Sequence, residues 1–129
     1  EIIAKWLDSN SRVTKVIYPG LQSQKQFDLA TKQHSSPDGD PVYGSMISFE
    51  LDSSINLDNF AKNLSIITLA ESLGGVKSLI SCPYSMTHAS VPHEEKTELG
   101  ITPNLLRFSV GIEHADDLIS ELDYAMNHN

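Results

Sequence analysis

The stretch Leu105-Leu106-Arg107-Phe108-Ser109-Val110 decides the fold, because its apolar and polar residues alternate. Successive side chains of a β-strand point to opposite faces, so the apolar residues share one face and Arg107 and Ser109 share the other. The segment Ser45–Leu51 alternates in the same way. Both segments are therefore predicted to be strands with one buried face and one solvated face.

The other elements are predicted from turn formers, apolar spacing and helix caps. Strands are expected at residues 13–18, 65–69 and 76–82, and helices at residues 1–8, 23–33, 57–64, 92–99 and from near 116 onward. Asn56 is a good cap for the helix that follows it. Strands and helices mix without a regular βαβ alternation or an internal repeat. We therefore expect a two-layer α+β fold, a mostly antiparallel sheet with helices on one face.

The composition is that of a single domain, residues 1–129, with 40% hydrophobic and 20% charged residues. Seventeen acidic and nine basic residues give a net charge of −8, which repels phosphates and anionic lipids. Nucleic acid and membranes are therefore not expected partners. The apolar runs are too short to cross a membrane and no secretory signal opens the chain, so we expect a cytoplasmic location. The single cysteine, Cys82, excludes a disulfide framework.

The chain begins on a helical pattern without a cap. Ile2, Ile3, Trp6 and Leu7 have helical spacing, and only Glu1 precedes them. This start favours a piece of a longer protein, although processing of a mature protein would give the same start.

Arg107 is the most informative charged residue. A guanidinium on a sheet face offers a fixed fork of donors that can bind a carboxylate through two parallel hydrogen bonds. The alternative is a solvated arginine that only covers the sheet.

The segment Glu71–Gly75 is typical of a binding loop, because its two glycines would let the backbone approach a ligand closely. It matches neither the phosphate-binding loop nor the dinucleotide fingerprint. A tight turn or a bulge is the alternative, and the sequence around Ser72 contains no partner that marks it as a nucleophile.

A metal site is not expected. His88 and His93 are five residues apart with Pro92 between them, a spacing that suits no helical ligand pair. Cys82 is the only thiol, so a structural zinc site has little support.

Three motifs follow one another along the chain: Ala70–Leu79 (AESLGGVKSL), Met86–Pro92 (MTHASVP) and Leu106–Glu113 (LRFSVGIE). Together they resemble the C-terminal domain of the PLP-dependent enzymes of cysteine and methionine metabolism. This family includes cystathionine γ-synthase, the cystathionine β- and γ-lyases and methionine γ-lyase.

The resemblance implies a role for each matching residue. Arg107 would bind the α-carboxylate of the amino-acid substrate, and Thr87 would lie near that pocket and support it. Ser72 would sit beside the cofactor lysine and act in catalysis. Glu71 would lie near the distal end of the substrate, and Leu73 would also contact the substrate.

The resemblance also implies that most of the active site lies outside this chain. In the family, the lysine that forms the Schiff base with PLP belongs to a large preceding domain, and Lys77 is not in a cofactor-lysine motif. The implied partners are a sulfur amino acid, the large PLP domain of the same protein and the other subunits of a homotetramer. PLP would act in the full-length parent, so we expect the isolated chain to be inactive.

Two hypotheses follow. The first is the small C-terminal domain of a transsulfuration enzyme that performs β/γ-elimination or γ-replacement on cystathionine or a related amino acid. The sequence does not choose between synthase, γ-lyase and β-lyase. The second is a free-standing, non-catalytic domain that binds a carboxylate ligand or an enzyme subunit.

Overall fold

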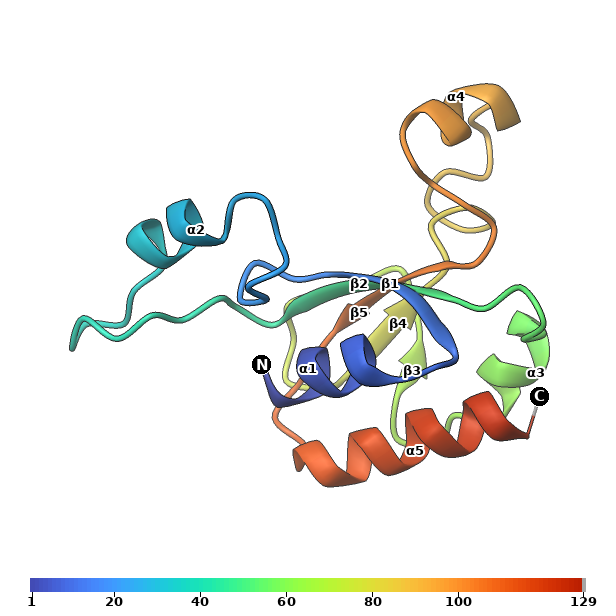
Figure 1. Ribbon diagram of the computed structural model, residues 1–129. Coiled ribbons are helices and arrows are strands. Elements are labelled where there is room, and N and C mark those ends of the chain that lie inside the picture. Colours follow the sequence, from blue (N-terminus) through green and yellow to red (C-terminus); the bar gives the residue numbers. More distant parts are fainter. Residues whose placement is uncertain (129) are drawn as a thin grey trace.

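The computed structural model describes residues 1–128, and this part of the chain contains one five-stranded sheet (Figure 1). Its strands are β1 (Val13–Ile17), β2 (Met46–Leu51), β3 (Thr68–Leu69), β4 (Leu79–Ser81) and β5 (Leu105–Ser109). They lie in the order β1-β2-β5-β4-β3, and every neighbouring pair is antiparallel except the parallel pair β3 and β4. The predicted α+β fold with a mostly antiparallel sheet is confirmed.

The two alternating segments form strands β2 and β5, as predicted, and the two strands pair with each other inside the sheet. Ile47 pairs with Phe108 and Phe49 pairs with Leu106 across β2 and β5. All four side chains are at most 3% exposed, and they form the middle of the hydrophobic core. Arg107 lies between Leu106 and Phe108 and therefore points to the opposite face.

Three helices cover the face that carries these core residues, which we call the inner face. They are α1 (Ile2–Ser9), α3 (Leu57–Lys62) and α5 (Ala115–Asn127) (Figure 1). Helix α5 packs against both α1 and α3 and buries Leu118, Leu122, Ala125 and Met126. The amphipathic pattern of this last helix thus fulfils its expected role as one wall of the core.

Two short helices stand away from the sheet on arms of the chain, on the side opposite α5 (Figure 1). They are α2 (Phe27–Gln33) and α4 (His93–Glu98). Helix α2 buries none of its residues, and α4 buries only Lys96. The prediction of helices on one face therefore holds for the three helices that pack on the sheet.

Strand β3 is shorter than predicted, because the backbone of residues 65–67 bonds to a side chain instead of to a strand. The carboxylate of Glu121 on α5 accepts hydrogen bonds from the backbone N–H groups of Ser65, Ile66 and Ile67. Only Thr68 and Leu69 remain to pair with β4. Three of the five residues predicted as strand, 65–67, therefore form a loop that a distant glutamate holds in place.

Other boundaries differ by a few residues. Strand β4 begins at Leu79 rather than residue 76, and α2 begins at Phe27 rather than residue 23. Asn56 caps α3 as predicted, because its side chain accepts a hydrogen bond of 3.0 Å from the backbone N–H of Asn59. Helix α5 begins at Ala115, where the side chain of His114 acts as the cap.

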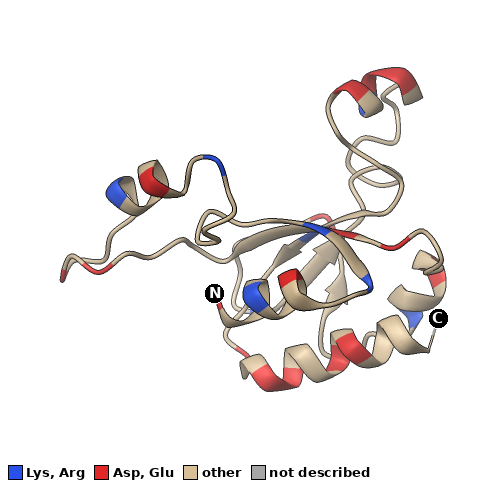
Figure 2. Cartoon of the chain, in the orientation of Figure 1, with Lys and Arg blue, Asp and Glu red and all other residues tan. Residues whose placement is uncertain are grey.

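Acidic side chains are concentrated on α4 and α5, whereas Lys and Arg residues are scattered over the chain (Figure 2). This distribution agrees with the net charge of −8. Within residues 1–128, no helix has the length and hydrophobicity needed to cross a membrane.

Candidate functional site

Arg107 lies on the outer face of the sheet, the face that α1, α3 and α5 leave free. Its cross-strand neighbours are Ser48 on β2 and Ser81 on β4. The side chain is half-buried, and its Nη2 donates a hydrogen bond of 2.8 Å to the backbone carbonyl of Glu71. The alternation predicted this orientation, and the structure adds a partner that the sequence did not indicate.

The segment Glu71–Ser78, which we call the site loop, runs back along β5 on this outer face. It connects the parallel strands β3 and β4, so it must return over the sheet to the starting end of β4. Its residues bond in order to the outer-face residues of β5 and the segment after it. The Arg107 guanidinium donates a hydrogen bond to the carbonyl of Glu71, and Ser109 Oγ accepts one from the N–H of Gly74 (2.8 Å). After the strand, the N–H of Ile112 donates to the carbonyl of Val76 (3.0 Å).

The site loop ends at Ser78, which is fully buried. Glu113 accepts a hydrogen bond from the Ser78 N–H at Oε1 (2.8 Å) and another from the Ser78 hydroxyl at Oε2 (2.7 Å). The N–H of Gly111 donates to the same hydroxyl (2.9 Å). Desolvation raises the pKa of Glu113, but the hydrogen bonds from Ser78 and the charge of Lys77 lower it more, so its pKa lies below the ordinary value.

The two glycines of the site loop have open space where a side chain would lie. Gly74 has φ +74°, a left-handed conformation that favours glycine, but a side chain there would meet open space. Gly75 is also surrounded by open space. A close approach between two segments of the chain occurs at Gly111, where a Cβ would overlap the backbone of Val76 and Lys77.

The structure brings together the site residues of the loop and of β5. Glu71 is bonded to Arg107, and Ser72 and Leu73 follow Glu71 on the exposed part of the site loop. Thr87 lies on a different segment, between β4 and α4, and its hydroxyl is hydrogen-bonded with Nδ1 of His88 (2.8 Å).

Ser81 is a polar residue of the outer face that the sequence analysis did not single out. It lies beside Arg107, is 1% exposed, and its hydroxyl has no hydrogen-bond partner among the described residues. Buried polar groups are normally paired. The sequence indicated Ser81 only through its place in the predicted strand 76–82. Alternation puts it on the face of Arg107 once the register of the strands is known.

The cysteine and histidine residues weighed as metal ligands have other neighbours. Cys82 Sγ lies 3.5 Å from the carbonyl of Pro103, and Nδ1 of His93 is bonded with the Tyr84 hydroxyl (2.9 Å). Within residues 1–128, no three His, Cys, Asp or Glu side chains gather as metal ligands would.

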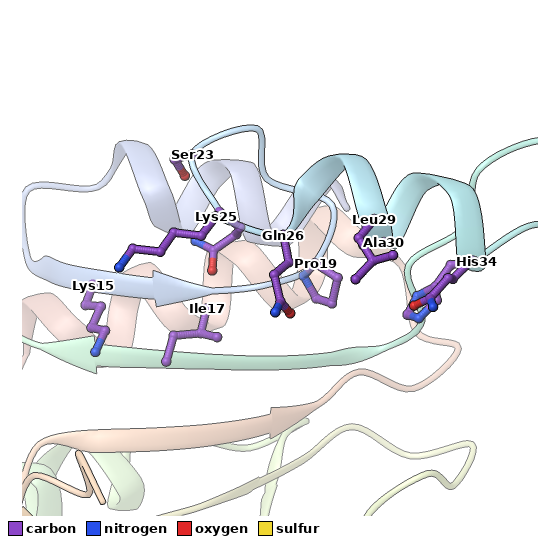
Figure 3. A pocket seen from close by; sticks show the side chains of 11 residues that line it. Lys15, Ile17, Pro19, Ser23, Lys25, Gln26, Leu29, Ala30 and His34 are labelled. Atoms are coloured by element: carbon purple, nitrogen blue, oxygen red, sulfur yellow. The ribbon is translucent and has the colours of Figure 1, made fainter. Parts of the chain in front are cut away.

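A cavity of about 690 Å³ lies between β1 and α2 (Figure 3). Ile17 and Lys15 line it from β1, and Leu29, Ala30 and His34 line it from α2 and its cap. None of the predicted site residues lines this cavity. Ile17 is the neighbour of Ser48, which pairs with Arg107, so the cavity and Arg107 share the outer face two strands apart.

Comparison with known proteins gives a consistent result. The family described as Cys/Met metabolism PLP-dependent enzyme matches residues 1–127. The chain is 47% identical over 124 residues to a cystathionine beta-lyase of Lactococcus lactis and 44% identical over 126 residues to a cystathionine gamma-lyase of Bacillus subtilis. It covers 31% and 32% of those two proteins, which in turn cover 96% and 98% of the chain.

The fold agrees with the sequence match. The crystal structure of cystathionine gamma synthase from Xanthomonas oryzae pv. oryzae in complex with cystathionine superposes with a TM-score of 0.85 at 41% identity. The match covers 98% of the chain and 31% of that structure.

Proposed function

The chain belongs to the family of PLP-dependent enzymes of cysteine and methionine metabolism, and on this premise we propose that it is the small C-terminal domain of a transsulfuration enzyme. The relatives are cystathionine lyases and a synthase, and the chain spans about 31% of their length. The remaining two-thirds would contain the large PLP domain, and the parent would be a cytoplasmic homotetramer.

The central role in this proposal belongs to Arg107, which binds the α-carboxylate of the amino-acid substrate. The observation that carries it is the hydrogen bond to the carbonyl of Glu71, which restrains the orientation of the guanidinium. An arginine has five N–H donors, so four remain for a carboxylate. A fork that is already oriented loses less freedom when it binds its partner.

The site loop supplies the other roles. Ser72 helps to position the substrate or the cofactor lysine, Leu73 contacts the substrate, and Glu71 faces its distal end. Their exposure on the outer face supports these roles, because it leaves them free to meet a ligand. Thr87 completes the carboxylate pocket from its separate segment. The glutamate at position 71 favours cystathionine as the substrate.

PLP supplies an electron sink for such reactions when it is bound. The residues of this chain do not fit it on their own. The N–H of Gly74 is already bonded to Ser109 and is not free for a phosphate. Lys96 Nζ bonds to the carbonyls of Tyr84 and Ala89. The Schiff-base lysine would therefore come from the large domain, and the isolated chain would not catalyse the reaction.

The reaction class is elimination or replacement at the β or γ carbon of a sulfur amino acid. Residues outside this chain would contribute to the choice between them. The experiment is to supply the intact protein with PLP and cystathionine and to measure the release of a free thiol. Thiol release supports a transsulfuration lyase. Binding of amino acids with neither release of a thiol nor consumption of an added thiol substrate would favour the non-catalytic carboxylate-binding domain.

A further inference from the structure

The site loop lacks a hydrophobic anchor of its own. Leu73 and Val76 are 51% and 67% exposed, and each residue from Glu71 to Lys77 is exposed. Loops with few buried apolar contacts open locally at low free-energy cost unless other interactions hold them. The conformation of the site loop must therefore depend on its hydrogen bonds to β5 and to the segment that follows β5.

These hydrogen bonds differ in strength between the two ends of the loop. Arg107 bonds to a carbonyl of the exposed residue Glu71, where water competes for both partners. Glu113 accepts hydrogen bonds from the N–H and the hydroxyl of fully buried Ser78, so a partly buried, ionised acceptor meets two donors that water does not reach. Both contacts are charge-assisted, because the Arg107 guanidinium and the Glu113 carboxylate are ionised. The Ser78 end is the firmer of the two, because it has two such bonds and its donors belong to a fully buried residue.

The backbone around Gly111 keeps Glu113 in reach of Ser78. A Cβ at Gly111 would overlap the carbonyl oxygen of Val76 and the carbonyl carbon of Lys77, so the two segments touch directly. The N–H of Gly111 also donates to the Ser78 hydroxyl. That hydroxyl thus bridges Gly111 and Glu113 and closes a small network at the base of the loop.

From this geometry we propose that Glu113 is the positioning residue of the site: it holds Glu71–Ser78 in the conformation that presents Ser72 and Leu73 to the substrate. The contacts described above support the effect of Glu113 on the conformation of the loop. Its effect on substrate binding rests on the proposed function. Glu113 acts through Ser78 and does not itself touch the substrate.

The test compares Glu113→Ala with Glu50→Ala in the intact, PLP-loaded protein. Glu50 is a matched control, because its carboxylate also accepts a hydrogen bond from a hydroxyl, that of Thr102 at 2.7 Å. The readout is hydrogen exchange at the amides of Gly74 and Ile112, whose N–H groups hold the loop to the sheet. The amides of β2 and β5 report the stability of the core.

Loss of a hydrogen bond to a charged group costs about 1.5–3 kcal/mol, which corresponds to roughly 10- to 100-fold faster exchange. Glu113→Ala should accelerate exchange at Gly74 and Ile112 by this factor, relative to the amides of β2 and β5. Glu50→Ala should not. Exchange at the loop amides that stays at the wild-type rate in Glu113→Ala would overturn the proposal.

Two further variants keep the test decisive. Ser78→Ala removes only the hydroxyl and should give a smaller acceleration at the same two amides, which makes it the test if Glu113→Ala does not fold. Glu113→Gln keeps an acceptor for the Ser78 N–H and should restore part of the protection. Wild-type loop exchange in Ser78→Ala would also contradict the proposal.

A kinetic measurement separates this inference from the proposed function. In the intact enzyme, Glu113→Ala should raise KM for the sulfur amino acid about tenfold or more, with the absorbance of the bound cofactor unchanged. Faster loop exchange with an unchanged KM would confirm that Glu113 stabilises the loop conformation, and it would reject the loop as part of the substrate site. Wild-type hydrogen exchange at the loop amides with a raised KM would show that Glu113 does not stabilise the loop conformation.

Discussion

Nη2 of Arg107 donates a hydrogen bond of 2.8 Å to the backbone carbonyl of Glu71, a residue 36 positions earlier in the chain. This bond joins the middle of β5 to the start of the site loop. It ties the orientation of the guanidinium to the position of the residues that follow Glu71. Because the acceptor is a backbone carbonyl, substitution of the Glu71 side chain should leave this link in place.

The backbone of the site loop should tolerate substitution at some glycines and not at others. Gly111→Ala forces a Cβ into the backbone of Val76 and Lys77 and should cost about 1–3 kcal/mol of unfolding free energy. Gly74→Ala has space but keeps a left-handed conformation, so it should cost about 1–2 kcal/mol. Gly75→Ala meets open space and should change stability by less than about 0.5 kcal/mol.

Urea unfolding at pH 7 measures these three values. We expect Gly75→Ala to lower the unfolding free energy least and Gly111→Ala to lower it clearly. A Gly111→Ala variant as stable as the wild type would show that the two segments do not pack as closely as described.

Because of Glu121, the free energy of unfolding should decrease as the pH falls. Burial raises the pKa of Glu121, but hydrogen bonds from the backbone of residues 66–67 and from Ser65 lower it more, to below the ordinary value of 4.5. The unfolded chain therefore takes up this proton at a higher pH than the folded chain. The stabilisation is complete above about pH 4.5 and is lost as the pH falls toward the lowered pKa of the folded state.

Glu121→Gln removes the charge and should cost about 1–2 kcal/mol at pH 7, with a weaker loss of stability in acid than the wild type. Urea unfolding between pH 7 and pH 3 measures both effects. Asp123→Asn, an exposed change on the same helix, is the control and should leave the stability at pH 7 unaltered. Equal acid dependence in wild type and Glu121→Gln would contradict this role for the carboxylate.

The isolated chain should not form a stable imine with PLP. Mixing the two should give the spectrum of free PLP with no additional imine band, because the proposed cofactor lysine belongs to the large domain. Lys77 is the lysine of the site loop and is exposed. A clear imine band that disappears in Lys77→Ala would refute this expectation.

The sequence predicted those elements whose pattern is complete within one short segment of the chain. The alternation of residues 45–51 and 105–110 defines two faces without reference to the rest of the chain, so β2, β5 and the side of Arg107 were correct. Asn56 was recognisable as a cap for the same reason.

The remaining features depend on contacts between distant residues. The amides of residues 65–67 bond to Glu121, more than 50 positions away, and this shortens β3. Ser78 meets Glu113 across 35 positions. Lys96 lies in a segment that resembles a solvated acidic helix, yet its ammonium is buried against the carbonyl of Tyr84. Periodicity within one segment carries no information about such partners.

The most direct test of the central claim is the KM of the intact enzyme for its amino-acid substrate in Arg107→Ala, Arg107→Lys and Arg12→Ala. Loss of a bidentate carboxylate contact of about 3 kcal/mol should raise KM roughly 100-fold in Arg107→Ala. Arg107→Lys should recover only part of this loss, because an ammonium lacks the planar fork. Arg12 lies in the turn between α1 and β1 and is not among the site residues, so Arg12→Ala should match the wild type. A wild-type KM in Arg107→Ala would contradict the assignment of Arg107 as the carboxylate-binding residue.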